Sequence, residues 1–245
     1  MNWKKDLREK DDAVSPVIAL MLILAILATC LAVYTTTYVP GLKQQDEITH
    51  SGEVKLAFMR FASDIDNVIA QGKPAVYTEV LELGGGDVPL SPTKSSGTIE
   101  INPLPIGTYQ TGSETKDLNG IEISYTPSFT AWEKQGYLYQ NGVVWITKEE
   151  KVTPAELKLY TIQNGTDRQN ETLQKWYPAP SADTVIIPQF TVDENKTEIT
   201  GTSTVKLRLN ATLGGEMTNV KVTLNGDAEK IYTNARLLNI EVSVE

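Results

Sequence analysis

Three patterns of hydrophobic and polar positions follow one another along the chain. An uninterrupted apolar run extends from Val14 to Val33. A second segment carries apolar residues at helical spacings of 4, 3, 4 and 3, namely Val54, Phe58, Phe61, Ile65 and Val68. From Ala75 onward, short apolar and polar alternations are separated by turn residues. This order predicts an α+β protein in which a long N-terminal hydrophobic helix precedes a β-rich, sandwich-like domain.

The apolar run is long enough to cross a membrane. No charged side chain lies between Ala13 and Leu42, and 20 helical residues span roughly 30 Å, the thickness of the hydrocarbon layer of a bilayer. The run continues through Tyr34–Val39 without the small-residue cleavage site that ends a secretory signal peptide. We therefore expect a retained helix over 14–39 with membrane lipid around it.

The first 13 residues form a charged leader. Four basic side chains are balanced by four acidic ones: Lys4, Lys5, Arg8 and Lys10 against Asp6, Glu9, Asp11 and Asp12. Because basic residues dominate membrane orientation, the N-terminus is expected in the cytoplasm and everything after about Tyr38 outside the cell.

The segment 40–72 is predicted to be a juxtamembrane amphipathic helix. Pro40-Gly41 should kink or interrupt the path from the membrane helix, and Gly72-Lys73-Pro74 should end the second one. The apolar face of this helix favours packing against the protein's own domain, and burial against neighbouring subunits is the alternative.

The remainder, 73–245, is expected to form one domain of short strands, although two subdomains meeting near Pro178–Pro180 stay possible on sequence grounds. Asn141-Gly142 predicts a two-residue hairpin turn. No helix as strong as the first two is evident. Predicted strands are Ala75–Leu83, Gly97–Ile101, Ile121–Tyr125, Tyr137–Tyr139, Val143–Ile146, Leu157–Thr161, Val205–Leu209, Val220–Leu224 and Ile240–Val244.

The junction Asp12-Ala13-Val14-Ser15-Pro16-Val17-Ile18 resembles the class III signal peptide and hydrophobic domain of euryarchaeal type IV pilins and pilin-like surface proteins. Residues 39–69 also resemble the juxtamembrane helix of large members of that group. The resemblance covers about residues 10–72. An uncleaved single-pass anchor with a coincidental Ser-Pro is the alternative.

The resemblance implies a processing site and an assembly surface. A prepilin peptidase would cut between Ala13 and Val14, and the released helix would pack into a filament core with copies of itself or with other pilins. Ile18 stands where bacterial pilins carry a glutamate, which weakens a bacterial-style assembly mechanism. The implied filament-core residues are Val14, Ile18, Leu22, Leu27 and Leu31.

Composition narrows the classes of function. The net charge of −9 argues against nucleic-acid binding. The only cysteine, Cys30, lies in the apolar run, and the only histidine, His50, is expected to be a solvated surface residue. We therefore expect no catalytic triad, no His/Cys metal site and no cofactor. Four sequons are candidates for N-glycosylation, at Asn164, Asn170, Asn195 and Asn210.

Three weaker signals are read as structural. Gly84-Gly85-Gly86-Asp87 lacks the Gly-Lys-Ser/Thr ending of a phosphate loop and is expected to connect strands. Asp117-Leu118-Asn119-Gly120 and Asp193-Glu194-Asn195 carry possible oxygen ligands but are expected to be turns, since neither supplies the ligand spacing of a calcium loop. The last signal is an aromatic group that is expected to form cross-strand core pairs, with a sugar-binding platform as the alternative. Its members are Trp132, Tyr137, Tyr139 and Trp145.

Together these observations predict a non-enzymatic, structural or adhesive surface protein that assembles through its N-terminal helix and contacts cells or surfaces. A solitary, membrane-anchored binding module is the alternative. A hydrolase that uses only carboxylates is a third reading, although no spacing singles out an acidic pair.

Overall fold

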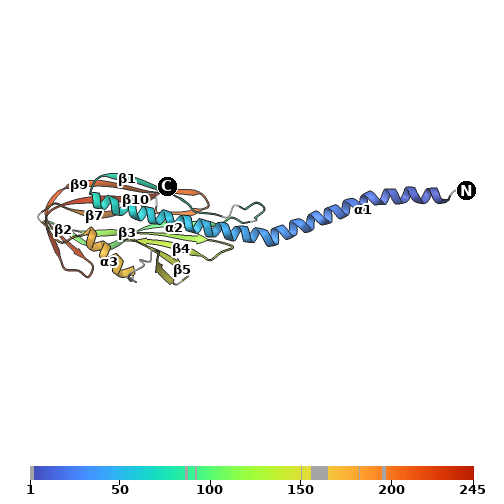
Figure 1. Cartoon of the computed structure of the whole chain (residues 1–245). Coiled ribbons are helices and arrows are strands. Elements are labelled where there is room, and N and C mark those ends of the chain that lie inside the picture. Colours follow the sequence, from blue (N-terminus) through green and yellow to red (C-terminus); the bar gives the residue numbers. More distant parts are fainter. Residues whose placement is uncertain are drawn as a thin grey trace.

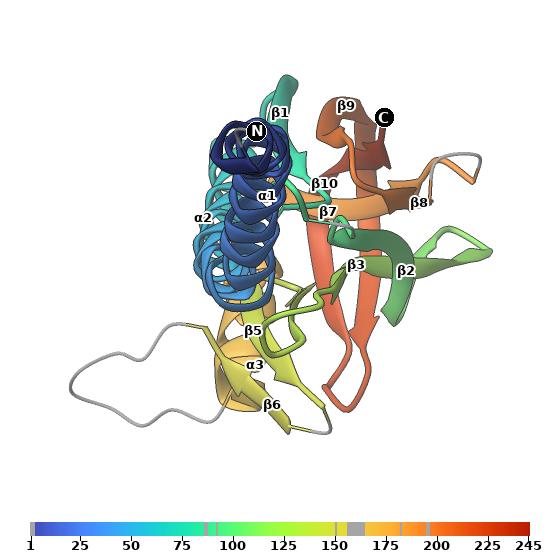
Figure 2. The same cartoon turned by 90° about the vertical axis from the view of Figure 1, so that its right-hand side faces the viewer.

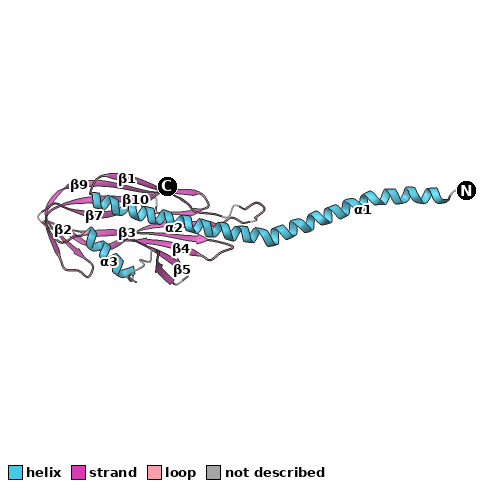
Figure 3. Ribbon diagram, viewed as in Figure 1, coloured by secondary structure: helices cyan, strands magenta, loops and turns pink. Residues whose placement is uncertain are grey.

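The computed structural model of the chain describes residues 3–85, 88–91, 93–149, 151–155, 165–181, 183–194 and 197–245. A helical rod occupies the N-terminal part. It consists of α1 (Trp3–Val33), a π-helical turn η1 (Tyr34–Tyr38) and α2 (Val39–Gln71). The second half of this rod lies against the β-rich head, whereas α1 projects away from the head as a free stalk (Figures 1 and 3).

The rod is not interrupted at Pro40, which corrects the expected break. Pro40 is the second residue of α2, directly after the π-helical turn, and the helix continues through it although proline has no N–H to donate to the preceding turn. The irregularity lies one turn earlier, where the amide of Val39 donates to the carbonyl of Tyr34 five residues back. Thr35 and Thr36 donate their hydroxyls to carbonyls of the preceding turn, so polar groups in this wider turn are satisfied without ending the helix.

One hydrogen-bonded sheet makes up the head. Among the described residues its strand order is β6-β5-β4-β3-β2-β9-β10-β7, with β1 added to β9 and β8 added to β2. The strands are β1 (Ala75–Glu82), β2 (Ser96–Thr111), β3 (Glu114–Ser128), β4 (Gln135–Gln140), β5 (Val143–Lys148), β6 (Lys151–Pro154), β7 (Val185–Val192), β8 (Glu198–Gly201), β9 (Thr204–Leu224) and β10 (Lys230–Val244).

Long shared strands bend this sheet. The first half of β9 pairs with β1, and its last residues pair with β2 over Gly107–Gln110. Gly107 is needed there, because a Cβ atom would lie 2.1 Å from the carbonyl oxygen of Thr223. At the far end, β7 runs parallel to β10, and the Gln189 side chain of β7 bonds the backbone of β3 at Asn119 and Asp117. The sheet therefore curls until β7 meets β3. Its strands are all hydrogen-bonded into one sheet rather than divided between the two sheets of a sandwich.

Helix α2 lies along one side of the curved sheet, next to β1 and β5 (Figure 2), and its apolar face is part of the core. Val54, Phe58, Phe61, Ile65 and Val68 are all at most 2% exposed and belong to the same core as the strand residues. This confirms that the seam packs against the protein's own domain. The glycine at the end of α2, Gly72, adopts the left-handed conformation that closes a helix.

Two sequence-based expectations about the head were wrong in detail. The predicted strands Val205–Leu209 and Val220–Leu224 are the two ends of the single strand β9, because Gly214-Gly215 lets the strand continue through a bend rather than turn. A helix that was not expected, α3 (Gly165–Trp176), follows the hairpin region. Its sequence is polar and has apolar residues only near its C-terminus, so no apolar stripe marks it as a helix. The predicted strand Leu157–Thr161 lies outside the described residues.

The Asn-Gly turn is confirmed. Asn141 and Gly142 both have positive φ, at 42° and 85°, as a type I′ hairpin between β4 and β5 requires. Asn141 is buried, and its side-chain oxygen accepts a hydrogen bond from the amide of Ile121. The turn is thereby joined to the neighbouring strand β3.

Candidate functional site

The stalk α1 presents an apolar surface that nothing in the described structure covers. Its large hydrophobic side chains from Val17 to Val33 are between 51% and 66% exposed. Of the described residues, one helix, near the N-terminus, is long and apolar enough to cross a membrane, and its most apolar window is entirely unburied. A helix that is hydrophobic on all sides requires a lipid or protein environment around it.

The residues implied by the pilin resemblance all lie on this stalk. Ala13 and Val14 are within α1. Ile18 and Leu22 lie on one side, and Leu27 and Leu31 on roughly the opposite side, as the helical period requires. All four are exposed by more than half. Cys30 is exposed on the same stalk.

Where α2 enters the head, a set of buried polar side chains ties the helix to surrounding loops and strands. We call this set the polar collar; its helical members are Lys43, Glu47, His50 and Ser51, all at most 4% exposed. Their spacing of 4, 3 and 1 continues the apolar seam of α2 toward the N-terminus. The collar therefore lies on the same face of the helix as the core residues.

Glu47 makes the most extensive contacts of the collar. Its Oε1 accepts hydrogen bonds from the Ser95 hydroxyl and from the amide and hydroxyl of Thr130, the latter two at 2.9 and 3.2 Å. Its Oε2 accepts from the amide of Ala131 at 2.9 Å. Burial by itself raises the pKa of Glu47, but the hydrogen bonds from Ser95, Thr130 and Ala131 outweigh it and leave the pKa below its usual value. The carboxylate is thus held ionised between two loops.

Lys43 lies one turn before Glu47. Its ammonium group donates to the carbonyl and hydroxyl oxygens of Thr93, at 2.6 and 2.8 Å. This contact holds the segment between β1 and β2 against the helix. The glycines of that segment permit the approach, since a Cβ on Gly84 would lie 2.3 Å from the Ser95 carbonyl oxygen. Gly84-Gly85 is therefore a close-packing loop, as expected from the sequence; Gly86-Asp87 lies outside the described residues.

His50 is buried, which overturns its expected role as a solvated surface residue. Its Nε2 lies 3.0 Å from the hydroxyl of Tyr125, which itself donates to the carbonyl of Leu83 at 3.0 Å. Because the single hydroxyl proton goes to Leu83, His50 must be the donor to Tyr125. Desolvation lowers the pKa of His50, against the opposing effect of the nearby carboxylates Glu53, Glu82 and Asp46.

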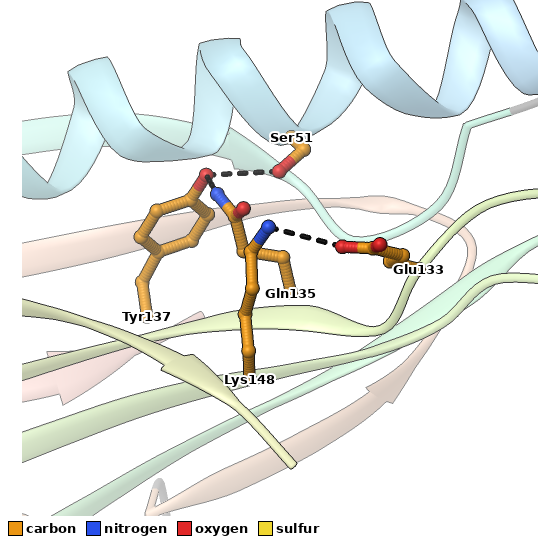
Figure 4. A network of polar contacts seen from close by, with 5 residues as sticks. All are labelled: Ser51, Glu133, Gln135, Tyr137 and Lys148. Atoms are coloured by element: carbon orange, nitrogen blue, oxygen red, sulfur yellow. Dashed lines mark hydrogen bonds and ion pairs between the residues drawn. The ribbon is translucent and has the colours of Figure 1, made fainter. Parts of the chain in front are cut away.

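Ser51 connects the collar to the hairpin. Its hydroxyl lies 2.8 Å from that of Tyr137 in β4, which also accepts a hydrogen bond from Gln135 at 2.6 Å (Figure 4). Beside them, Lys148 of β5 pairs with Glu133 at 3.0 Å. The Lys148 ammonium group also lies 5.9 Å from the ring of Trp132. The collar and hairpin together therefore fix the direction in which the stalk leaves the head.

The aromatic group at the hairpin is mainly core. Tyr137 and Tyr139 are each 1% exposed, whereas Trp132 and Trp145 are half-buried. Phe58 of α2 packs against Tyr137. The two tyrosines are therefore core residues rather than a sugar-binding platform. Their cross-strand neighbours in β3 are Tyr125 and Ile123, not the two tryptophans.

The candidate glycosylation sites differ in accessibility. Asn170 is exposed on α3, although the Thr172 hydroxyl of its sequon donates to the Arg168 carbonyl. Asn210 lies within β9 and is paired with both Val76 and Glu241. Asn164 and Asn195 lie outside the described residues. In the folded chain, Asn170 is consequently the more accessible acceptor of the two described ones.

The part of the chain that the structure describes contains no group of three or more His, Cys, Asp or Glu side chains placed to hold a metal ion. Sequence reasoning missed the collar because Lys43, Glu47 and His50 are polar. The available signal was their helical spacing to Val54, which places them on the buried face of α2.

Comparisons with protein families, curated proteins and solved structures found no match to this chain.

Proposed function

We propose that the protein is a type IV pilin-like surface subunit whose N-terminal helix anchors the precursor in the membrane and, after processing, packs into a filament. The observation that supports this most is the division of the helical rod. Its α2 half is locked into the head by the seam and the collar, whereas the large apolar side chains of α1 from Val17 to Val33 are exposed. Such a stalk can exchange lipid for the stalks of neighbouring subunits.

The Asp12-Ala13-Val14-Ser15-Pro16 junction supports processing. Cleavage between Ala13 and Val14 would remove the charged leader and leave the apolar stalk at the new N-terminus. The head would then form the outer surface of the filament. The sequons and the acidic net charge of −9 fit an extracellular position for that surface.

The first test is to shear appendages from cells and to identify the N-terminal peptide of this chain by mass spectrometry in the sheared and membrane fractions. We expect a peptide beginning at Val14 in the sheared material. An intact leader found only in the membrane fraction would overturn the filament proposal.

A matched pair of substitutions tests the stalk. Leu27→Lys puts a charge on the stalk, whereas Ile231→Lys puts one at a similarly exposed apolar position on the head. We expect Leu27→Lys to abolish filaments and Ile231→Lys to leave them, with both proteins present in the membrane fraction. Filaments of normal abundance from Leu27→Lys cells would contradict stalk packing.

The alternative is a membrane-anchored binding module that does not polymerise. The attachment of α2 to the head favours this alternative as much as it favours the filament subunit, because the same collar would hold a single head at a fixed distance above the bilayer. This alternative predicts an uncleaved chain that resists shearing, so the same fractionation separates the two functions.

A further inference from the structure

The head contains a mixed polar and apolar cavity of about 540 Å³ between the end of α2, the end of α3 and the start of β7. Asp66 lies 27 residues after Val39, the first residue of α2, which corresponds to about 40 Å along the helix. The cavity is therefore at the end of the head opposite the stalk. Residues that matter for its chemistry are Asp66, Ile69, Lys175, Trp176, Thr184 and Ile186.

Asp66 is the one acidic residue in the lining of this cavity among the described residues. Its Oδ1 accepts a hydrogen bond from the buried indole of Trp176 at 3.1 Å, which orients the carboxylate. Its Oδ2 has no hydrogen-bond partner among the described residues. Desolvation raises the pKa of Asp66, against the opposing hydrogen bond from Trp176 and the charge of Lys175. Because Asp66 is exposed, its Oδ2 is accessible to water and equally to a ligand in the cavity.

The same carboxylate also lines a second, smaller cavity of about 180 Å³, together with Ser63, Gly142 and Arg168. Close to it lies the hydroxyl of Tyr139, which is fully buried and has no hydrogen-bond partner among the described residues. Asp66 therefore lines both cavities. The larger cavity, with a few polar groups beside apolar ones, has the usual make-up of a small-ligand site.

The charges of the larger cavity favour a neutral ligand. Asp66 contributes one negative charge and Lys175 one positive charge, and the Lys175 ammonium group is shared with Glu171 at 3.1 Å. Hydroxyl groups of Ser181 and Thr184 add both donors and acceptors, and the Thr172 hydroxyl, which donates to the Arg168 carbonyl, adds an acceptor. The rest of the lining is largely aliphatic and includes Ile69, Pro178, Val185 and Ile186.

We propose that this cavity binds a neutral saccharide of one or two rings. Ring hydroxyls would donate to Asp66 and accept from Lys175, while the C–H face of the ring would pack against the aliphatic wall. The volume lies within the range of about 300–1,000 Å³ that is usual for small-ligand sites. The biological role of this site rests on the proposed surface function. In a surface protein, the site would lie at the end of the head away from the membrane anchor, facing neighbouring cells or surfaces.

The experiment measures binding to the full chain, purified in lauryldimethylamine oxide, a detergent without a sugar headgroup. Maltose, lactose and N,N′-diacetylchitobiose are offered at millimolar concentration and observed by saturation-transfer NMR. We expect signal transfer to at least one of them. Absence of transfer to all three overturns the proposal.

Substitutions then locate the site. Asp66→Asn keeps an acceptor for Trp176 but removes the charge, and it should weaken binding by about tenfold or more, the range expected for a lost hydrogen bond to a charged group. Lys175→Met alters an exposed side chain and should also weaken binding without affecting folding. The matched control is Asp64→Asn, on the same helix but outside the cavity lining. Equal weakening by the control, or none by the first two variants, overturns the assignment.

Two further outcomes are informative. Displacement of the saccharide by glycylglycine would show that the cavity selects a zwitterion, which contradicts the proposal. Saccharide binding by a chain that is never sheared from cells would refute the filament function and leave this site standing. The two proposals can therefore fail separately.

Discussion

The imidazole of His50 in α2 lies 3.0 Å from the hydroxyl of Tyr125 in β3, so that the rod and the sheet are joined across 75 residues of sequence. Both side chains are buried. His50 is the only histidine of the chain. Its protonation can therefore be followed without interference from another imidazole.

The stability of the head should fall when the solution is acidified below the usual pKa of histidine. Burial lowers the pKa of His50 below 6.5 in the folded state, so between the two pKa values the unfolded chain binds a proton that the folded chain does not. The contribution of neutral His50 to the free energy of unfolding is therefore fully present above pH 6.5 and is lost as the pH falls through the lower folded-state pKa. Chemical denaturation of the full chain at a series of pH values measures this loss.

The variant His50→Gln serves as the control for that measurement. It keeps a donor for Tyr125 but does not titrate, so the pH dependence in this window should disappear. The raised pKa values of Asp64, Asp66 and Glu79 act in the opposite direction at lower pH, and they are the same in both proteins. Identical pH profiles for the two proteins would contradict the role of His50.

Glu47→Gln should destabilise the head by about 2–3 kcal/mol. The substitution removes a charge that accepts four hydrogen bonds, and the new amide N–H₂ has to face an N–H group of Thr130 or Ala131. Thermal unfolding in detergent measures the change. Glu53→Gln, an exposed position on the same helix, should change stability by less than about 0.5 kcal/mol.

The low pKa of Glu47 gives this comparison a second readout. Because its folded-state pKa is depressed, the contribution of Glu47 is present above its unfolded pKa of 4.5 and is lost as the pH falls through the folded-state value. The stability difference between the wild-type chain and Glu47→Gln should shrink below that pH. A difference that persisted at lower pH would mean that the charge is not what stabilises the collar.

Ile65→Ala should cost about 2–5 kcal/mol, because this fully buried side chain fills the core between α2 and the sheet. Leu56→Ala on the same helix removes a side chain that is 51% exposed and should cost much less in the isolated chain. Urea unfolding of both variants checks the prediction. Similar losses for the two would show that α2 does not pack on the sheet by the face described above.

Gly107→Ala should disrupt the junction of β2 and β9. The added methyl group would lie 2.1 Å from the Thr223 carbonyl oxygen and 2.9 Å from the Leu224 Cα atom, so one strand has to move away. Gly215→Ala in β9 meets no atom within 4 Å and its φ is not positive. Hydrogen exchange at Val222 and Tyr109 should quicken in the first variant alone. Unchanged protection in Gly107→Ala would mean that the ladder accommodates a side chain there.

Local periodicity was sufficient to predict the apolar stalk, the buried seam of α2, the Asn141-Gly142 turn and the β-rich character of the head. These features depend on residues a few positions apart, and hydrophobic burial acts on each in the same way wherever the segment lies. The predicted interval 40–72 matches α2 to within one residue for the same reason. Helix α3 escaped prediction because its few apolar residues contact the rest of the head only near its C-terminal end.

The tertiary structure alone decided which polar residues became hydrogen-bonded partners. Glu47 contacts Ser95 and Thr130 across 48 and 83 residues, and Asp66 contacts Trp176 across 110. No local pattern marks such pairs, because a polar side chain is equally acceptable in water until the fold removes the water and supplies a hydrogen bond in its place. The collar and the distal cavity, which carry the functional proposals for the head, are for this reason products of the three-dimensional arrangement, whereas the exposed stalk was already determined by the sequence through its composition.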